Sequence, residues 1–438
     1  MSLTLRVLSF FWIISIAASA EKHKFIALLG GQSTWIFQGN TPLSGKNFNP
    51  DLSFGPEANF SWSGTVSIFA GVSPWKGAFF MVEPEYSNAH GMPNGSGMAG
   101  FPNGELVRVS VTGSNPPPYI ARAFYHQEFA LGADTPPELR EFENRFFPSG
   151  NNAITFSIGK FAANDFFDAS MIASDPRHHF LNWALMEQGA WDYPADVRGY
   201  TYGVILGLEK PLFALRAGVA LMPKVANGLD LNWNLIQSRS EIIEAQVRYW
   251  ILKQPGSLKL MMYFNHAPMG NYDQALESAQ PNMAPDIIAT RAETTLKVGL
   301  GVLMEQQINN QIAAFLRAGF NDGQTETFAF TEIDRSLSIG AHMTGAYWNR
   351  PKDRLALAVA VSGLSASHAR YLAAGGKGFQ LGDGGLDDAW ETILETYYMI
   401  SLAENIEASA DIQGIFNPGM NAGHSPTAVF GLRLHGHY

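Results

Sequence analysis

The sequence of 438 residues contains no cysteine, and after residue 20 it has no run of about 18 consecutive apolar residues. The first absence excludes a fold held together by disulfides. The second excludes a transmembrane helix in the rest of the chain, because a spanning helix needs about 20 apolar residues. A net charge of −10 argues against nucleic acid as a partner.

The first twenty residues have the pattern of a secretory signal peptide. Arg6 supplies a basic start, the apolar run "VLSFFWIISIA" follows, and "ASA" at 18–20 matches a small-residue cleavage site. The apolar run is too short to span a membrane. We therefore expect cleavage near Ala20. No repeat or low-complexity linker divides the remainder, so residues 21–438 are expected to form one domain.

Aromatic residues are abundant although the chain as a whole is not hydrophobic. There are 30 Phe, 14 Tyr and 10 Trp, yet the mean hydropathy is −0.04. In residues 57–72, "EANFSWSGTVSIFAGV", apolar side chains alternate with polar ones. Period two predicts a strand with one apolar and one polar face. Apolar residues spread over alternate positions are typical of outer-membrane barrels.

About sixteen segments alternate in this way, an even number, as bacterial single-chain barrels require. The predicted strands are 25–38, 57–72, 76–87, 118–131, 153–161, 197–209, 212–221, 241–252, 256–266, 292–305, 311–321, 335–348, 354–363, 390–402, 405–417 and 426–438.

The connections between these segments alternate between long and short. A membrane barrel has tight turns at its periplasmic end and long loops outside. The short turn before residue 354 is predicted at "RPK", 350–352, and the one expected turn that is long, 132–152, contains a predicted short helix, "PPELREFENRF". The sequence thus predicts an all-β fold: a closed antiparallel transmembrane β-barrel of about 16 strands with an aqueous lumen, in the outer membrane of a Gram-negative bacterium.

The polar face of each strand should line the lumen. Arginine on a lipid face at the bilayer midplane costs about 2–4 kcal/mol, so Arg122, and with it Ile120 and Phe124 of the same parity, should point inward. The lumen-facing candidates for contacting a solute are Glu57, Glu83, Glu85, Arg122, His126, Glu128, Arg216, Arg248 and Arg317. Both signs of charge occur, which suits a neutral, polyhydroxylated solute better than an ion. The alternative for each residue is that it only keeps the lumen wet.

Loop 162–196 is the best candidate for narrowing the channel. It is long and too apolar to extend into water, so we expect it to fold inward, with loop 88–117 as the second candidate. Loop 162–196 also contains charged residues, of which Asp165, Asp168 and Arg177 are further candidates for contacting the solute. Trp183 or Trp191 is predicted to offer a flat face on which a sugar ring stacks.

Other motifs point only weakly to catalysis or metal binding. Glu83 and Glu85 could form a glycosidase pair, but both are expected to face water on one strand. His178 and His179 are adjacent, so their side chains should diverge rather than share a metal. The sequence "GDGGLDD" at 382–388 lacks the 12-residue pattern of a calcium loop and is interpreted as a turn. We expect no enzymatic activity and no cofactor. A barrel enzyme such as a lipase, or a plugged receptor barrel, remains the alternative.

Several stretches resemble the carbohydrate-selective porin family, OprB type. They include "GFPNGEL" (100–106), "FLNWALMEQGAWDYPADVRGYTYG" (180–203), "NDGQTETFAFTEIDRSLSIG" (321–340) and the ending "PTAVFGLRLH". The resemblance implies a sixteen-stranded porin that admits glucose and other sugars, including small oligosaccharides, by facilitated diffusion. The expected partners besides sugars are outer-membrane lipids, lipopolysaccharide and the barrel-assembly machinery, which would read the last strand ending on Tyr438. Whether the porin is a monomer or a homotrimer stays open.

Overall fold

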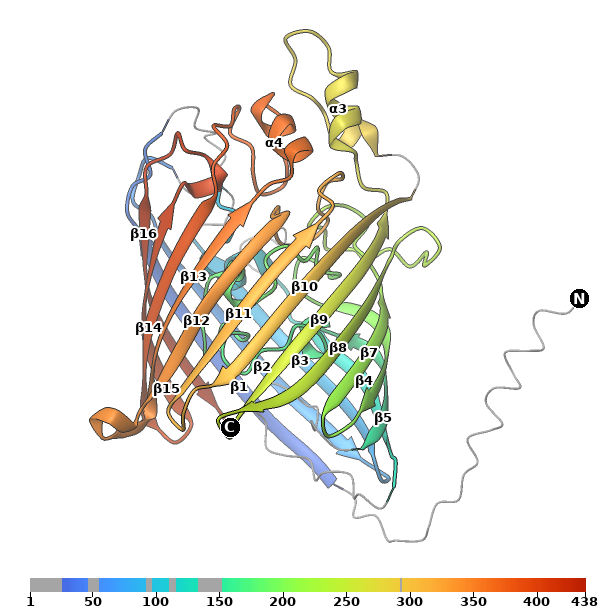
Figure 1. Ribbon diagram of the computed structural model, residues 1–438, viewed down its shortest axis with the longest axis vertical. Coiled ribbons are helices and arrows are strands. Elements are labelled where there is room, and N and C mark those ends of the chain that lie inside the picture. Colours follow the sequence, from blue (N-terminus) through green and yellow to red (C-terminus); the bar gives the residue numbers. More distant parts are fainter. Residues whose placement is uncertain (1–25, 46–54, 92–96, 110–115, 133–151, 292–293) are drawn as a thin grey trace, which may run out of the picture.

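Sixteen antiparallel strands form one closed barrel (Figure 1) in the computed structural model, which describes residues 26–45, 55–91, 97–109, 116–132, 152–291 and 294–438. Each strand pairs with the next along the chain, and the last pairs with the first. The strands are β1 (Ile26–Asn40), β2 (Phe60–Ser73), β3 (Ala78–His90), β4 (Tyr119–Ala130), β5 (Ala153–Phe161), β6 (Thr201–Glu209), β7 (Phe213–Ala220), β8 (Arg239–Ile251), β9 (Gln254–Ala267), β10 (Thr295–Gln307), β11 (Ile312–Asn321), β12 (Arg335–Gly345), β13 (Arg350–Gly363), β14 (Glu391–Ala403), β15 (Ile406–Phe416) and β16 (Thr427–His437). The predicted fold class and strand number are confirmed.

The helices are short and belong to the connections. Within the described ranges, none is long and apolar enough to cross a membrane. The helices are α1 (Gly104–Arg108), η1 (Ala163–Asp165), α2 (Trp183–Met186), α3 (Tyr272–Ser278), η2 (Ile288–Thr290), η3 (Ala346–Trp348), α4 (Ala366–Ala373) and η4 (Pro418–Met420).

Closure of the barrel gives every strand a hydrogen-bonded neighbour on both sides. The β1–β16 ladder runs from Gln32 opposite His437 to Asn40 opposite Val429. Beyond it, Gly31 and Tyr438 exchange two backbone hydrogen bonds of 2.9 Å. A sheet in hydrocarbon cannot leave an unpaired edge, because water is absent there to bind the free N–H and C=O groups. The alternating C-terminal strand thus supplies the seam of the barrel.

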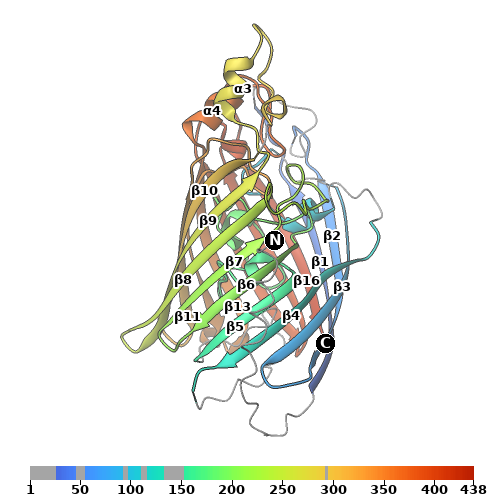
Figure 2. The same ribbon diagram turned by 90° about the vertical axis from the view of Figure 1, so that its right-hand side faces the viewer.

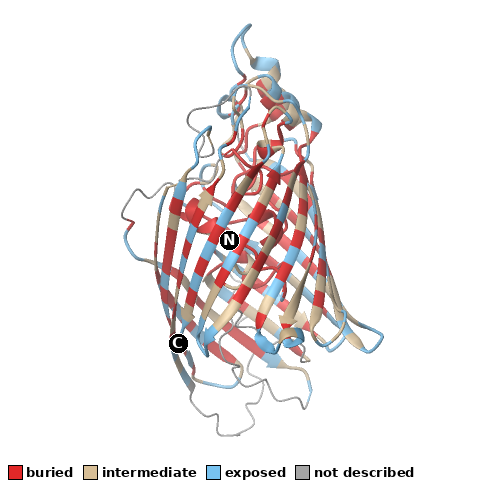
Figure 3. Ribbon diagram, turned by 90° about the vertical axis from the view of Figure 1, so that its left-hand side faces the viewer, coloured by how far each residue is buried: buried red, intermediate tan, exposed pale blue. Residues whose placement is uncertain are grey.

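The two faces of the strands separate as the alternation predicts. On β2, Val66 and Ile68 are exposed on the outer wall, whereas Thr65 and Ser67 are buried in the interior. Figure 3 shows the same red-and-blue alternation along the neighbouring strands. The outer wall is therefore apolar and the interior polar, as a membrane barrel requires.

The long connections gather at one end of the barrel and the short turns at the other, which we take as the periplasmic end. Figure 2 shows α3 and α4 standing above the loop end, and the C-terminus lies at the turn end. The predicted signal peptide and the helix expected within 132–152 lie outside the described residues.

Three local predictions are wrong. β2 begins only at Phe60, so Glu57 is an exposed loop residue and does not line the lumen. The turn between β12 and β13 is made by η3 and Asn349 (φ 61°) rather than by residues 350–352, because Asn tolerates the left-handed backbone that the turn needs. Ile120 faces outward because a bulge opposite Glu83 and Pro84 shifts the β3–β4 register there.

Candidate functional site

The connection between β5 and β6, residues 162–200, lies inside the barrel. Nearly all of its side chains are buried, and Figure 1 shows its green trace within the ring of strands. The backbone N–H groups of Leu181 and Asn182 donate to Glu395 on β14 at 2.6 and 3.0 Å. Three strands away along the wall, Asp168 pairs with Arg317 of β11 at 3.1 Å. The predicted inward fold of this loop is confirmed.

Part of the β3–β4 connection, residues 97–109, also lies inside. Glu391 of β14 accepts hydrogen bonds from the backbone of Ala99 (2.9 Å) and Gly100 (2.8 Å). Asn103 then caps α1 by accepting from Glu105 N at 2.9 Å, as an N-cap residue does. This cap sets α1 against the wall, with Glu105 and Arg108 both buried in the interior.

The two inner loops and the wall strands β3 and β4 bring three arginines together with four carboxylates. Arg122 bonds Glu83 at 2.7 Å and holds both oxygens of Asp165 at 2.7 Å. Arg108 bonds Glu105 at 3.0 Å and also Glu85, which Arg177 reaches at 3.2 Å. We call Arg108, Arg122, Arg177, Glu83, Glu85, Glu105 and Asp165 the arginine–carboxylate cluster. Five of the residues predicted to contact a solute meet in it.

The cluster remains partly accessible although its charges are paired. The side chains of Arg108, Arg122 and Arg177 keep 10%, 12% and 10% of their surface exposed. Two tyrosine hydroxyls join them: Tyr119 and Tyr200 accept from Arg108, each at 2.9 Å. Donors, acceptors and hydroxyls therefore stand side by side.

Burial and charge act against each other in the loop residues of this cluster. Burial disfavours the charged form of Arg108, but Glu105 and Glu85 outweigh it and raise the pKa of the guanidinium well above its ordinary value. Burial raises the pKa of Tyr200 as well. Arg108 therefore stays positive and Tyr200 keeps its proton at any physiological pH.

Charges around the cluster nearly balance in number. Next to it, Lys160 lies 4.0 Å from Asp196, Asp175 lies 4.0 Å from Arg177, and Arg198 stands 4.0 Å over the Tyr119 ring. With these residues included, five cations face six carboxylates. The cations are Arg108, Arg122, Lys160, Arg177 and Arg198, and the carboxylates are Glu83, Glu85, Glu105, Asp165, Asp175 and Asp196. A region in which both signs of charge are interspersed in nearly equal number gives neither ion sign a strong preference.

A second group of charged side chains lies on the wall toward the turn end. Arg216 bonds Glu209 at 2.6 Å and Glu244 at 3.1 Å, and Arg248 bonds Glu209 at 3.1 Å. His126 and Glu128 also face inward and are buried there, with His126 hydrogen-bonded to Ser157 at 2.7 Å. This group is separate from the arginine–carboxylate cluster.

The prediction of a free tryptophan face is wrong. Trp183 stacks on Phe330 with ring centroids 4.7 Å apart, and Phe101 covers it from another side at 5.3 Å. Trp191 is buried as well, at 1% exposure. Both rings anchor the inner loops because the lumen supplies aromatic partners that a loop sequence alone does not reveal. Asp168 and Arg317 likewise are buried and join the loop to the wall.

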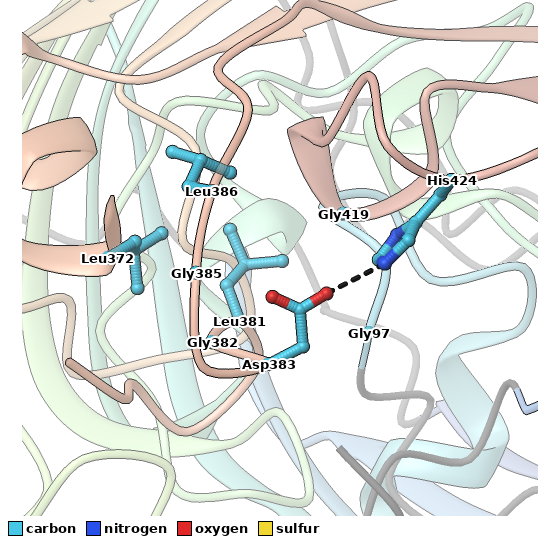
Figure 4. Close-up of a pocket in the computed structure, with 9 residues that line it drawn as sticks. All are labelled: Gly97, Leu372, Leu381, Gly382, Asp383, Gly385, Leu386, Gly419 and His424. Carbon is cyan, nitrogen blue, oxygen red and sulfur yellow. Dashed lines mark ion pairs between the residues drawn. The ribbon is translucent and has the colours of Figure 1, made fainter. Parts of the chain in front are cut away.

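The other motifs hold loops together. His178 bonds Glu407 at 2.9 Å, and no group of three or more His, Asp or Glu side chains in the described ranges is arranged to hold a metal. Asp383, from "GDGGLDD", points at His424 at 2.7 Å across a pocket at the loop end (Figure 4). That pocket measures about 10 Å³, which admits one water at most.

Sequence reasoning missed Glu105, Arg108, Tyr119, Lys160, Asp196, Arg198 and Tyr200. Glu105 and Arg108 are three residues apart and follow Asn103, a typical N-cap residue. This pattern could have indicated a helical turn with an ion pair on one face. Tyr200 and Arg198 were assigned to a strand that in fact starts only at Thr201.

A closed barrel with an apolar wall, a polar interior and two loops folded into its lumen defines an outer-membrane solute channel of the porin class. The model of the family described as carbohydrate-selective porin, OprB family, matches residues 75–438, and the chain belongs to this family. It is an outer-membrane channel for carbohydrates, and fold and family favour a channel over an enzyme.

The fold is also that of a solved family member. The high-pH structure of OprB from Pseudomonas putida is similar with a TM-score of 0.69 at 16% identity, over 94% of each chain. The outer membrane channel DcaP of Acinetobacter baumannii has a TM-score of 0.49 at 10% identity, over 97% of this chain and all of that one. No curated relative matches the chain.

Proposed function

We propose that the arginine–carboxylate cluster is the selective constriction of this sugar channel and that it passes neutral hexoses such as glucose and small oligosaccharides. The near balance of five cations and six carboxylates carries the proposal. A neutral solute meets no net repulsion there. Its hydroxyls can donate to the carboxylates and accept from the arginines.

Transport by this route is passive. The solute exchanges hydrogen bonds with paired groups at each step, so it binds weakly enough to leave on the other side. Of the residues singled out in the sequence, Arg122 and Arg177 would contact the sugar in the cluster. The side chains of Glu83, Glu85 and Asp165 are only 2%, 0% and 7% exposed, so they would act by holding and neutralising these arginines. His126, Glu128, Arg216 and Arg248 would line the route toward the periplasmic end. Asp168, Trp183 and Arg317 would act by holding the inner loops.

We propose that residues 1–20 direct export and are removed near Ala20, that residues 21–438 form the barrel domain, and that the assembly machinery inserts this domain through its last strand. Outer-membrane lipids and lipopolysaccharide surround the wall. The channel works as a monomer or a homotrimer.

Swelling of liposomes that contain the purified porin tests the proposed selectivity. Glucose, its anionic oxidation product gluconate and the cationic glucosamine have similar size, so their rates compare charge directly. We expect glucose to enter several-fold faster than either ion. Arg108→Gln should shift the order in favour of glucosamine, whereas Arg370→Gln, which removes an exposed cation of α4, should leave it unchanged. Equal rates for glucose and gluconate would refute a constriction that selects by its nearly balanced charges.

A further inference from the structure

A trough runs along β15 on the outer wall of the barrel. Two sets of cross-strand neighbours form it. In the first set, Ala410 lies between Tyr398 of β14 and Leu432 of β16. In the second set, Ala408 lies between Ile400 of β14 and Leu434 of β16. Two consecutive alanines on the outward face of one strand thus stand between larger side chains on both sides.

The trough is a sizeable apolar groove. Its volume is about 450 Å³, and Phe37 of β1 extends its far rim opposite Leu432. Its lining side chains lie within a few residues of the turn end of β14, β15 and β16. Since the turn end is periplasmic, the groove lies in the periplasmic half of the membrane.

Cationic and aromatic side chains stand at the foot of this groove. Tyr398 on its flank accepts a hydrogen bond from Trp348 Nε1 at 3.0 Å and donates to Asp353 at 2.6 Å. Asp353 also binds Arg350, whose guanidinium donates to Ser401 O of β14. The η3 turn, the orange coil at the lower left of Figure 1, is thereby fastened to the groove.

The fastened turn carries two cations, Arg350 and Lys352, against the one carboxylate of Asp353, and so has a net positive charge at headgroup level. The Arg350 side chain keeps 47% of its surface exposed, and Lys352 two residues on is exposed too. Trp and Tyr residues mark the membrane–water interface, and Lys and Arg clusters next to it attract anionic lipid headgroups. The apolar trough and the two cations therefore match the two parts of one molecule, an acyl chain and a phosphate.

We propose that this site binds one anionic glycerophospholipid of the periplasmic leaflet, with an acyl chain along Ala408 and Ala410 and the headgroup phosphate at Arg350 and Lys352. The cations also favour this occupant over a second copy of the chain, which would bring a like-charged turn to the same rim. The trough is separate from the sugar route, because Ala408, Ala410 and Leu432 stand on the outer face of the sheet.

Native mass spectrometry of the full-length porin tests the site. The detergent-solubilised protein is offered equal amounts of phosphatidylglycerol and phosphatidylcholine with the same acyl chains. We expect one phosphatidylglycerol to bind preferentially. Ala410→Leu should remove it by filling the trough, and Arg350→Gln or Lys352→Gln should each weaken it about fivefold.

Matched variants separate the site from general lipid contact. Ala245→Leu changes an outward alanine of β8 that also lies between leucines, Leu215 and Leu260, and Lys253→Gln removes an exposed cation from another turn. Both should bind lipid like the wild type, and sugar uptake by Ala410→Leu should be unchanged, which shows that it is folded. Equal binding of the two lipids, equal loss in Ala245→Leu, or a protein dimer that Ala410→Leu dissociates would each overturn the proposal.

Discussion

Glu85→Gln should change the ion preference of the channel without changing its fold. Glu85 is buried and bonds Arg108, Arg177 and Tyr119 in the arginine–carboxylate cluster. The substitution keeps the size and the acceptor oxygen but removes one negative charge. Five cations against six carboxylates become five against five. An ion passing the cluster then meets one negative charge fewer.

The expected magnitude follows from Coulomb's law. A unit charge acts on a monovalent ion about 6 Å away with about 0.7 kcal/mol in a water-like dielectric. Chloride gains this energy and potassium loses it, so the difference is about 1.4 kcal/mol, or about tenfold in the permeability ratio. Salt weakens the effect, because the Debye length falls from about 10 Å at 0.1 M to about 3 Å at 1 M.

Reversal potentials across a planar bilayer measure this ratio. A potassium chloride gradient around 0.1 M should show the chloride-to-potassium ratio of Glu85→Gln raised up to tenfold over the wild type, and at 1 M the difference should shrink. Asp273→Asn is the control, since it removes an exposed carboxylate of α3 at the loop end. An unchanged ratio in a variant that still forms channels would refute the placement of Glu85 beside the ion path.

Three further outcomes are expected. Deleting residues 169–176 from the inner loop should raise the single-channel conductance and lower the ratio of the glucose rate to the disaccharide rate, while the barrel still assembles. If the conductance and this rate ratio both stay unchanged, segment 97–109 is the constriction instead. Trp183→Ala should destabilise the inner loops by about 3–5 kcal/mol, because it empties a buried ring site, and hydrogen exchange in the loop should rise while the strands stay protected. Burial disfavours the charged form of His424, but the Asp383 carboxylate outweighs this effect and raises the His424 pKa. The ion pair should therefore stabilise the loop end fully below pH 6.5, and this stabilisation should be lost as the pH rises through the raised pKa. Proteolysis of the loops should then increase with pH in the wild type and not in His424→Gln.

The barrel was predictable because lipid outside and polar side chains inside impose period two on every strand. All sixteen segments coincide with observed strands, and the ends differ by a few residues. The errors fall where another constraint replaces the alternation. Asn349 makes a turn by its backbone conformation, and a bulge reverses the facing of Ile120.

The constriction was less predictable because it is built by loops that meet only in the folded barrel. Wall residues such as Glu83 and Arg122 could be assigned from strand parity. The position of Arg108 could not be assigned in this way. It depends on Glu391, which binds the backbone of Ala99 and Gly100, some 290 residues before it in the chain. The prediction for Trp183 was wrong for a related reason. An aromatic residue in a loop is equally compatible with burial and with solute binding, and here the ring is buried because it stacks on Phe330.

The pairing inside the cluster bears on how tightly a sugar can bind. Every arginine there already has carboxylate or hydroxyl partners, as with Arg122 between Glu83 and Asp165. A sugar hydroxyl that enters therefore exchanges one hydrogen bond for another, and the net gain of such an exchange is small. A site with unpaired buried charges would bind more strongly but would release slowly. Because flux through a passive channel needs both entry and exit, pre-paired charges suit a constriction that selects by fit and charge rather than by affinity.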